Sequence, residues 1–309
     1  DRTEGCSIAD WMMLNLNQGL IHGDDRSYDK AERIFWNALA FNQLITGGFG
    51  HRRIASNGYG LDQIHEAWWC CTPDAGMSLS ELARHIVTFR ENVIHVNFLF
   101  PGKYEIPLPD GNHARITIAT AYPSRAEATI VVENVPETFP VRIRVPEWVR
   151  NPVTKRTIAG KKVQLAFMGE MGHRIEQVNP GVIVTYGPLV LVPTRSVKVG
   201  SYNPAEQVAK ETEGYDPQSM PGGIPGIQLL THPDANGFVK LPLCPPDRPL
   251  PPWNYWDEGP GSPTWIEGSA AEVSLLFPDG NTHPVRFSPM CYNKSSLSMF
   301  ETPVVFGNA

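Results

Sequence analysis

The sequence has few cysteines, few basic residues and no long apolar run, and each shortage excludes a class of protein. Its 5 cysteines among 309 residues are too few and too unevenly spaced for a disulfide scaffold, which indicates reduced or metal-bound thiols. Lys and Arg total 26 against 32 acidic residues, with a net charge of -6 and no basic stripe, so we expect no nucleic-acid surface. The longest mostly apolar stretch, residues 182–192, falls short of the ~20 residues that span a bilayer, so no membrane span is expected.

What is present is an ordinary globular composition, 41% hydrophobic and long enough for two or three domains. Apolar residues at helical spacing dominate the first third of the chain. They predict one helix from Ser7 to about His22, a second over residues 24–46, and a third from a capping box at Ser78 to about Val87. The pair Asp24-Asp25 is interpreted as the N-terminus of the second helix.

From about residue 92 apolar and polar residues alternate, which predicts short strands separated by Pro, Gly and Asn turns. The expected strands are residues 93–100, 114–121, 128–133, 141–145, 163–167 and 182–192, with later ones at 238–243, 271–277 and 284–287. We therefore expect an α+β multidomain protein. Its predicted parts are a helical domain (1–91), an antiparallel β-sandwich (92–200) and a less regular sandwich-like module (201–309) that starts with a Pro/Gly-rich connector.

The densest group of reactive side chains is Cys70-Cys71, which follows two tryptophans and precedes Pro73. Neighbouring cysteines rarely pair with each other, because a disulfide between them closes a strained ring. We therefore expect two free thiols or two thiolates on a metal.

Glu4 and Cys6 supply two further donors just before the first predicted helix, where the helix dipole favours a thiolate. With Cys70 and Cys71 they make three thiolates and one carboxylate, a set that can close a tetrahedral zinc site. The alternative is three small cysteines buried in a core, since free cysteine is among the most buried residue types. Spacing alone leaves both interpretations open.

The loop at residues 49–69 is long and rich in polar and aromatic side chains, which is typical of a functional loop. For His51, His65, Trp68 and Trp69 we favour a packed loop with hydrogen-bonded histidines over direct metal ligation. Exposed aromatic faces beside charged groups also suit carbohydrate rings, so a sugar-binding role is a second interpretation.

Five segments resemble, in the same order, the latter half of glycoside hydrolase family 127 (GH127). They are Glu4-Gly5-Cys6, ERIFWN at residues 32–37, Cys70-Cys71-Thr72-Pro73-Asp74, residues 93–98 and YGPLV at residues 186–190. The resemblance covers roughly residues 1–198 and is weak beyond them. The family comprises bacterial β-L-arabinofuranosidases and related glycosidases, built as an (α/α)6 barrel followed by β-sandwiches. It implies that residues 1–91 are the C-terminal helices of such a barrel, part of its catalytic domain.

The resemblance also implies a chemistry. In the family a Glu-x-Cys and a Cys-Cys bind one zinc ion, and the first cysteine of the pair is the nucleophile of a retaining mechanism. By motif, Glu4, Cys6, Cys70 and Cys71 become the Zn²⁺ ligands and Cys70 the nucleophile. The implied substrate is a carbohydrate with a terminal β-L-arabinofuranoside or similar sugar, on plant polysaccharide or glycoprotein glycan.

The chain departs from the family's pattern at positions next to the implied zinc ligands and at its first residue. Gly5 stands where the family commonly has Thr, and Thr72 and Asp74 vary the usual Pro and Asn. The acid/base of the family is a Glu upstream of the Glu-x-Cys motif, whereas this chain begins at Asp1. We therefore expect the later part of a longer protein, with a missing N-terminal half or a second copy as its partner. Any targeting segment would lie upstream, which leaves a cytoplasmic, periplasmic or secreted location open.

A second hypothesis is a non-catalytic fragment, in which zinc is structural and the sandwiches bind carbohydrate or a partner chain. It differs from the first in whether zinc keeps a position open to substrate, because structural sites are closed by four protein ligands. A third hypothesis is a sandwich protein with ordinary core cysteines.

Overall fold

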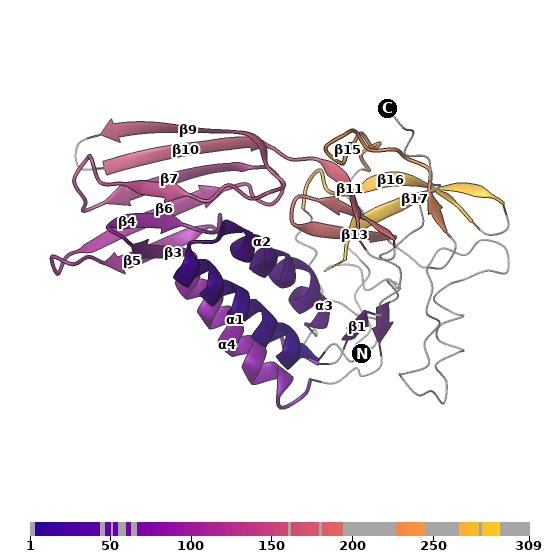
Figure 1. The fold of residues 1–309 in the computed structure, drawn as a ribbon, viewed down its shortest axis with the longest axis horizontal. Coiled ribbons are helices and arrows are strands. Elements are labelled where there is room, and N and C mark those ends of the chain that lie inside the picture. Colours follow the sequence, from indigo (N-terminus) through magenta and orange to yellow (C-terminus); the bar gives the residue numbers. More distant parts are fainter. Residues whose placement is uncertain are drawn as a thin grey trace. The chain divides into compact units, whose positions relative to one another are not determined.

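A computed structural model describes residues 4–43, 47–50, 52–54, 60–62, 67–159, 162–178, 181–193, 227–244, 266–277 and 280–290. Within these ranges the chain has a mixed α+β fold with few helices and several antiparallel sheets (Figure 1). None of the helices in this part of the chain is both long and apolar enough to cross a membrane. The (α/α)6 barrel stays a prediction, and the predicted connector at the start of the third module lies outside the described residues.

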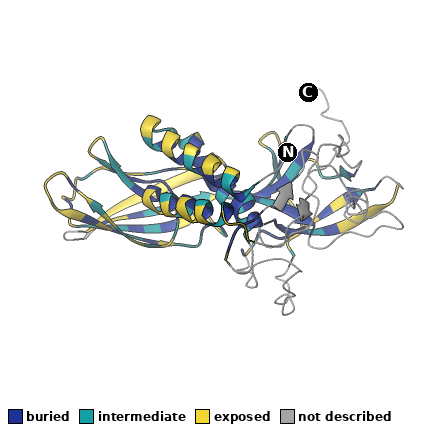
Figure 2. Ribbon diagram, turned by 90° about the horizontal axis from the view of Figure 1, so that it is seen from below, coloured by how far each residue is buried: buried dark blue, intermediate teal, exposed yellow. Residues whose placement is uncertain are grey.

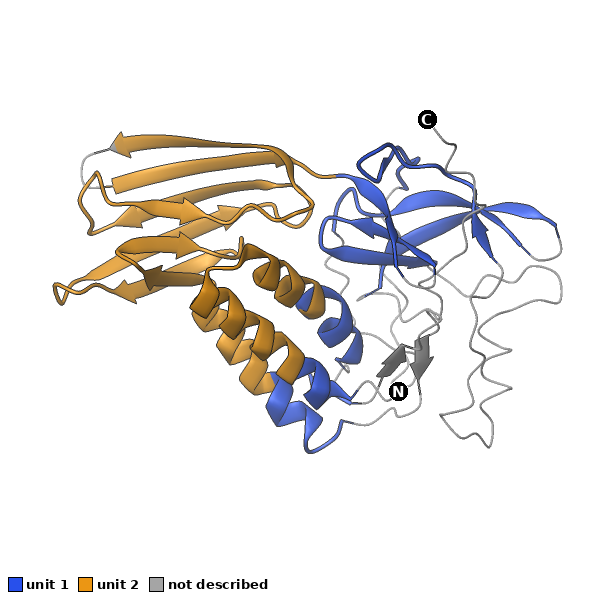
Figure 3. Cartoon of the chain, in the orientation of Figure 1, with its two compact units in different colours: residues 1–9, 35–75, 172–309 blue, residues 10–34, 76–171 orange. Residues whose placement is uncertain are grey.

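The chain forms two compact units, each assembled from segments that are distant in the sequence (Figure 3). Unit 1 contains residues 1–9, 35–75 and 172–309, and unit 2 contains residues 10–34 and 76–171. Helices α1 (Gly5–His22) and α4 (Cys71–His85) both begin in unit 1 and continue into unit 2. The domain boundaries after residues 91 and 200 stay predictions.

The first two predicted helices lie close to their expected positions. α1 ends at His22 as expected, and Gly23 after it has a φ of 65°, which suits the end of a helix. Asp24 caps α2 (Asp25–Arg33), because its carboxylate accepts hydrogen bonds from the backbone N of Arg26 at 3.1 Å and the hydroxyl of Ser27 at 2.7 Å. The second helix then continues as a π-helical segment, η1 (Ile34–Leu39), and as α3 (Ala40–Asn42).

The third helix begins earlier than predicted. α4 starts at Cys71, and Pro73 fits its first turn because the backbone N–H groups there have no partner within the helix. Ser78 is buried in the middle of the helix, and the Ser80 hydroxyl donates to the carbonyl of Gly76 at 3.0 Å. The predicted capping box is therefore wrong, because the helix has already begun at Cys71 and Ser78 lies inside it.

Unit 2 holds a five-stranded sheet in the order β5-β6-β7-β10-β9 and a three-stranded sheet in the order β3-β4-β8. All pairs are antiparallel except β4 with β8. The strands are β3 (Val87–Arg90), β4 (Val93–Val96), β5 (Gly102–Pro107), β6 (His113–Thr120), β7 (Glu127–Glu133), β8 (Val141–Ile143), β9 (Arg150–Ala159) and β10 (Lys162–Glu170).

Three of the predicted strands of unit 2 have one buried face. Alternate residues of β6, β7 and β10 are buried, and the expected strands there are confirmed. β9 is exposed at residues 151–158 and shows no alternation in the sequence, so it was missed. Val87 was placed in a helix but opens β3, because α4 ends at His85.

Unit 1 holds a seven-stranded sheet in the order β14-β16-β17-β13-β12-β11-β15. Its strands are β11 (His173–Gln177), β12 (Val182–Tyr186), β13 (Leu189–Pro193), β14 (Gln228–Leu229), β15 (Phe238–Val239), β16 (Ala271–Leu276) and β17 (Thr282–Pro289). The same unit contains the hairpin of β1 (Arg52–Ile54) and β2 (Gly60–Asp62).

The stretch predicted as one long strand at residues 182–192 is a hairpin of β12 and β13 that turns at Gly187, whose φ is 54°. Asn37 of η1 holds the turn. Its amide N donates to the Pro188 carbonyl at 2.9 Å, and its amide O accepts from the Val190 backbone N at 2.7 Å. The π-helical segment is thereby tied to the sheet of unit 1.

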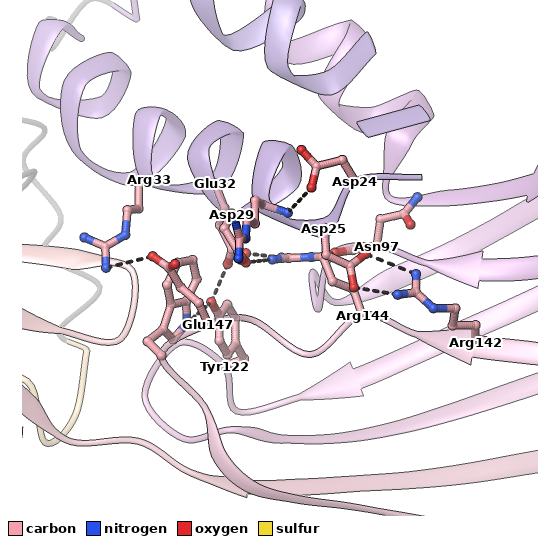
Figure 4. Close-up of polar contacts among 12 residues, drawn as sticks. Asp24, Asp25, Asp29, Glu32, Arg33, Asn97, Tyr122, Arg142, Arg144 and Glu147 are labelled. Atoms are coloured by element: carbon pink, nitrogen blue, oxygen red, sulfur yellow. Dashed lines mark hydrogen bonds and ion pairs between the residues drawn. The ribbon is translucent and has the colours of Figure 1, made fainter. Parts of the chain in front are cut away.

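A buried guanidinium group, that of Arg144, joins α2 to the strands of unit 2 (Figure 4). Its terminal nitrogens pair with the carboxylates of Asp29 and Glu32, and its Nε donates to the carbonyl of Asn97 at 2.5 Å. The side chain of Arg144 is 1% exposed and that of Glu32 is 0% exposed, so the charges depend on one another rather than on water.

Tyr122 and Trp148 complete this cluster. The Tyr122 hydroxyl donates to the second carboxylate oxygen of Glu32 and accepts from the Trp148 indole N at 3.1 Å. Burial raises the pKa of Asp29 from 3.8 to about 7; attraction to Arg144 opposes this shift and repulsion from Glu32 adds to it. One guanidinium thus pairs with two carboxyl groups, and that of Asp29 keeps its proton up to near-neutral pH.

Replacement of Arg144 by Met tests the cluster. It leaves two buried carboxyl groups without their cation, and we expect the free energy of unfolding to fall by about 3–5 kcal/mol. Urea denaturation measures the change. Arg115→Met, which breaks an exposed ion pair with Glu105, is the matched control and should have a small effect. Equal effects of the two substitutions would contradict a central role for the cluster.

The raised pKa of Asp29 makes stability depend on pH. The folded state keeps the Asp29 proton up to about pH 7, whereas the unfolded chain releases it near its ordinary value of 3.8. The free energy of unfolding should therefore fall as the pH rises through this window, by on the order of 4 kcal/mol at most. Urea denaturation across pH 4–8 should show this slope in the parent and in the exposed control Glu170→Gln, and lose it in Asp29→Asn. An unchanged slope in Asp29→Asn would refute this assignment.

Candidate metal centre

The first donors lie at the start of α1, where glycine permits a close approach. The backbone N of Gly5 donates to the carbonyl of Gly50 at 3.1 Å. A Cβ added at Gly5 would lie 2.9 Å from the Cβ of Cys71, closer than real Cβ atoms come to one another. A residue with a side chain at position 5 would not fit unless the neighbouring chain shifted. Gly5 therefore lets the first turn of α1 reach the first turn of α4.

The second group of donors lies at the start of α4, which Phe49 holds in place. The Thr72 hydroxyl donates to the Phe49 carbonyl at 3.2 Å and accepts from the Phe49 backbone N at 3.0 Å. The Trp68 backbone N donates to the same carbonyl at 2.9 Å. Residues 49 and 50 are thus bonded to both helix starts, and they fix the distance between the two groups of donors.

The predicted thiols come together in unit 1. The sulfur atoms of Cys6, Cys70 and Cys71 all lie within 4.8 Å of one another. Cys70 Sγ is 3.7 Å from Cys71 Sγ, and Cys6 Sγ lies 3.5 Å from Glu4 Oε2 in a weak hydrogen bond. None of the three is in a disulfide; Cys71 is fully buried, while Cys6 and Cys70 are partly exposed.

Two of these distances match the edges of a tetrahedral metal site. With Zn–S bonds of about 2.3 Å and a Zn–O bond of about 2.1 Å, sulfur atoms lie about 3.8 Å apart and sulfur and oxygen about 3.6 Å apart. The spacings within Cys70-Cys71 and within Glu4-Cys6 agree with both values. Three sulfur donors also favour a soft or borderline ion over Mg²⁺ or Ca²⁺. The carboxylate of Glu4 lies near Cys6 but is not among the atoms that all lie within 4.8 Å of one another. The cluster could therefore hold such an ion.

The pKa values of the thiols also bear on metal binding. Burial, and next the nearby Cys71, raise the pKa of Cys6 to about 12, and burial is also the largest cause that raises the pKa of Cys71. Both thiols lie in the first turn of a helix, where the dipole favours a thiolate, but burial and mutual repulsion outweigh this effect. Without a cation Cys6 and Cys71 are most stable as neutral thiols, and a bound divalent ion would reverse that preference.

Other residues predicted near the site are placed only in part. Trp69 is 85% exposed and Trp68 36% exposed, so the two indoles are not core residues. His51 and His65 lie outside the described residues. The role of Phe49 and the close approach at Gly5 were not predicted, because the backbone contacts of a loop leave no signal in residue type.

Comparison with known proteins supports the resemblance at the level of the fold. The chain matches a GH127 β-arabinofuranosidase with a TM-score of 0.58 and 14% identity, over 97% of this chain and 49% of that one. It matches a structure described as a glycoside hydrolase with a TM-score of 0.64 and 16% identity, over 97% and 52%. A third match is a GH127 β-L-arabinofuranosidase from Geobacillus stearothermophilus T6, with a TM-score of 0.60 and 14% identity over 97% and 50%. No protein-family model and no curated protein sequence matches the chain.

The fold is thus one found in GH127 glycoside hydrolases, and the predicted resemblance is confirmed in this respect. The chain spans about half the length of the solved structures that it matches. The likeness covers 97% of this chain, so it extends past the first 198 residues, which carry the sequence motifs.

The close approach at Gly5 predicts a sensitive position. Gly5→Ala should push the start of α1 away from Cys71 and lower the affinity for Zn²⁺ by about 10-fold or more, as changes beside metal ligands do. Titration against a coloured zinc chelator measures this affinity. The matched control is Gly76→Ala in α4, where an added Cβ would meet nothing within 4 Å. Equal affinities in the two variants would contradict the role given to Gly5.

Proposed function

We propose that this chain is the C-terminal part of a retaining glycoside hydrolase of the GH127 type, which uses a zinc-bound cysteine thiolate as its nucleophile. The observation that carries the proposal is the convergence of Cys6, Cys70 and Cys71 from two separate helix starts. It occurs in a fold whose solved neighbours include β-arabinofuranosidases. In the architecture that we propose, the described helices belong to an (α/α)6 barrel and the sheets to β-sandwiches.

Glu4, Cys6, Cys70 and Cys71 are the residues that would hold the zinc ion. Their donor types and the two measured spacings support this assignment. When bound, the ion would keep the sulfur atoms as thiolates and offset the charge that they share.

Cys70 is the nucleophile in this proposal, because it is partly exposed whereas its neighbour Cys71 is fully buried. Its sulfur attacks the anomeric carbon of a furanoside, the bond to the leaving oxygen breaks, and a thioglycosyl link to Cys70 forms. Water then displaces the sulfur, so two inversions retain the configuration. The proton for the leaving group comes from an acid that we place in a part of the enzyme outside this sequence. The proposed substrate is a terminal β-L-arabinofuranoside or a similar furanoside.

One observation favours a second candidate, a non-catalytic fragment with a structural zinc. Four protein donors fill a tetrahedral ion, and structural sites are closed in this way, whereas catalytic sites keep a position open. In that case the sheets would bind carbohydrate or a partner chain. The two candidates differ in whether Cys70 ever forms a bond to a sugar.

An activated substrate tests this difference. The nitrophenolate of 4-nitrophenyl β-L-arabinofuranoside leaves without protonation, so the missing acid is not needed for the first step. We expect one equivalent of nitrophenolate per zinc-loaded chain and a peptide in which Cys70 carries one pentosyl unit, detected by mass spectrometry. Cys70→Ser should abolish both signals.

Cys244→Ser is the control, because Cys244 is a partly exposed cysteine that forms no disulfide and lies outside the cluster. It should leave the release of nitrophenolate and the labelling unchanged. Zinc content is measured in every sample. A zinc-loaded parent chain that shows no labelled Cys70 would reject the catalytic proposal and favour the structural one.

A further inference from the structure

One face of the three-stranded sheet in unit 2 is polar although much of it is buried. Thr88 of β3 and Arg142 of β8 both pair with His95 of β4, so the three side chains share this face. Figure 2 shows buried stretches along both the helices and the strands, and β4 is buried at residues 94–96. The alternation of side chains places three more polar residues on the same face: Arg90, Asn97 and Arg144.

Two of the three arginines on this face are paired with acidic residues of α2. Arg142 donates to both carboxylate oxygens of Asp25, at 3.1 and 2.5 Å (Figure 4). Arg144 belongs to the buried cluster described above and has two carboxyl partners. The carboxyl groups of α2 thus offset the charges of these two arginines.

The third arginine, Arg90, has weaker partners. Its Nη1 donates to the carbonyl of Leu20 at 2.7 Å, and Gly23 leaves room for the guanidinium, because a Cβ there would lie 2.8 Å from Nη1. Arg90 also forms an ion pair of 3.6 Å with Glu91, whose side chain is 77% exposed, so water screens the attraction. The Nε of Arg90 is buried and has no hydrogen-bond partner among the described residues.

His95 supplies a second nitrogen of this kind. The residue is only 8% exposed, and its Nε2 is buried without a hydrogen-bond partner in the described part of the chain. Burial lowers the pKa of His95, and the charges of Arg90 and Arg142 lower it further. Buried polar atoms of native proteins nearly always have a partner. Two such nitrogens on one face of a sheet therefore indicate a ligand that they share.

Arg90 and His95 line one small cavity in unit 2, together with residues of α1 and α2. The cavity offers about 10 Å³ to the centre of a water-sized sphere, which is room for one water molecule or one single-atom ion. Tyr28 of α2 lines it as well, and burial raises the pKa of this tyrosine to about 12. Its hydroxyl therefore keeps its proton and is a third possible donor.

We propose that this cavity binds one small monovalent anion of the size of chloride, held by Arg90 Nε, His95 Nε2 and the Tyr28 hydroxyl. Arginine can only donate hydrogen bonds, and an imidazolium and a phenol can donate as well, so the three groups suit a single acceptor. The anion supplies the negative charge that α2 gives to the other two arginines but not to Arg90. A water molecule would accept the same bonds without offsetting this charge.

Binding of the anion is coupled to a proton on His95. A bound anion stabilises the imidazolium and so raises the pKa of His95, which burial and the two arginines otherwise lower. By linkage, the anion binds more tightly as the pH falls and His95 takes up its proton. The charged groups that line the cavity or act on the ring come from three places, since α1 contributes none: Arg90 and Glu91 on the β3–β4 hairpin, Arg142 on β8 and Asp25 on α2.

Histidine NMR of the 309-residue chain tests this coupling. The pKa of His95 is measured in sodium chloride and in sodium gluconate at the same ionic strength, because gluconate is too large for the cavity. Chloride should raise the pKa of His95 and leave that of His85 unchanged. His85 is a buried histidine that pairs with Glu81 and does not line the cavity. His95→Gln and His85→Gln assign the two signals. The same His95 pKa in both salts, or an equal change at both histidines, would overturn the proposal.

Substitutions of Arg90 test the donor. Arg90→Gln should weaken chloride binding by about 10-fold or more, because it removes a charged donor. Arg90→Lys keeps the charge but has no Nε–H, and it should also weaken binding. The matched control is Arg115→Gln, which removes the same charge from the exposed pair with Glu105. Circular dichroism checks the folding of each variant, and Tyr28→Phe is a milder change that should weaken binding in the same direction. Folded Arg90 variants that bind chloride as the parent does would contradict the assignment.

Bromide identifies what the cavity holds, because it replaces chloride and scatters X-rays anomalously. Crystals grown in sodium bromide should show an anomalous peak between Arg90 and His95 that is lost in Arg90→Gln. Density at this position without an anomalous signal would mean a bound water molecule and would overturn the proposal. No zinc donor or proposed nucleophile lines the cavity, so these results do not depend on whether Cys70 forms a sugar adduct.

Discussion

The proposed site depends on one constraint, which is that three sulfur atoms lie within 4.8 Å of one another. Such a group is stable as neutral thiols or as thiolates around a cation, but not as thiolates alone, since like charges at this distance repel strongly when they are partly buried. Hydrogen bonds of the backbone and of the Thr72 hydroxyl help to bring them together. Gly5 removes the side chain that would hold the helices apart, and residues 49 and 50 bond to both helix starts.

The same chain also contains a buried ion cluster around Arg144, but it serves another purpose. In unit 2 two carboxyl groups, a guanidinium, a phenol and an indole satisfy one another's hydrogen bonds, so no group is left to react. In the cysteine cluster three sulfur atoms lie within 4.8 Å of one another, and none of them is in a disulfide. The contrast explains why we assign chemistry to the cysteines and a structural role to the ions.

The sequence predicted those features that depend on local chemistry. The cap at Asp24, the end of α1 and the alternating strands β6, β7 and β10 were expected because neighbouring residues determine them. The start of α4 was missed, because Ser78 and Glu81 match a capping box although the helix had already begun at Cys71. The Arg144 cluster was not foreseen either, because its ion pairs join residues 112 and 115 positions apart, and no local pattern records such a contact. For the site, the donor residues could be named from their types, whereas their spacing required the fold.

The central claim is that the cysteine cluster is a zinc site, and X-ray absorption at the zinc edge of the purified chain tests it most directly. The account expects one zinc per chain, with three sulfur neighbours at about 2.3 Å and one oxygen neighbour at about 2.0–2.2 Å. A chain that takes up no zinc, or whose bound zinc has only nitrogen and oxygen neighbours, would contradict it.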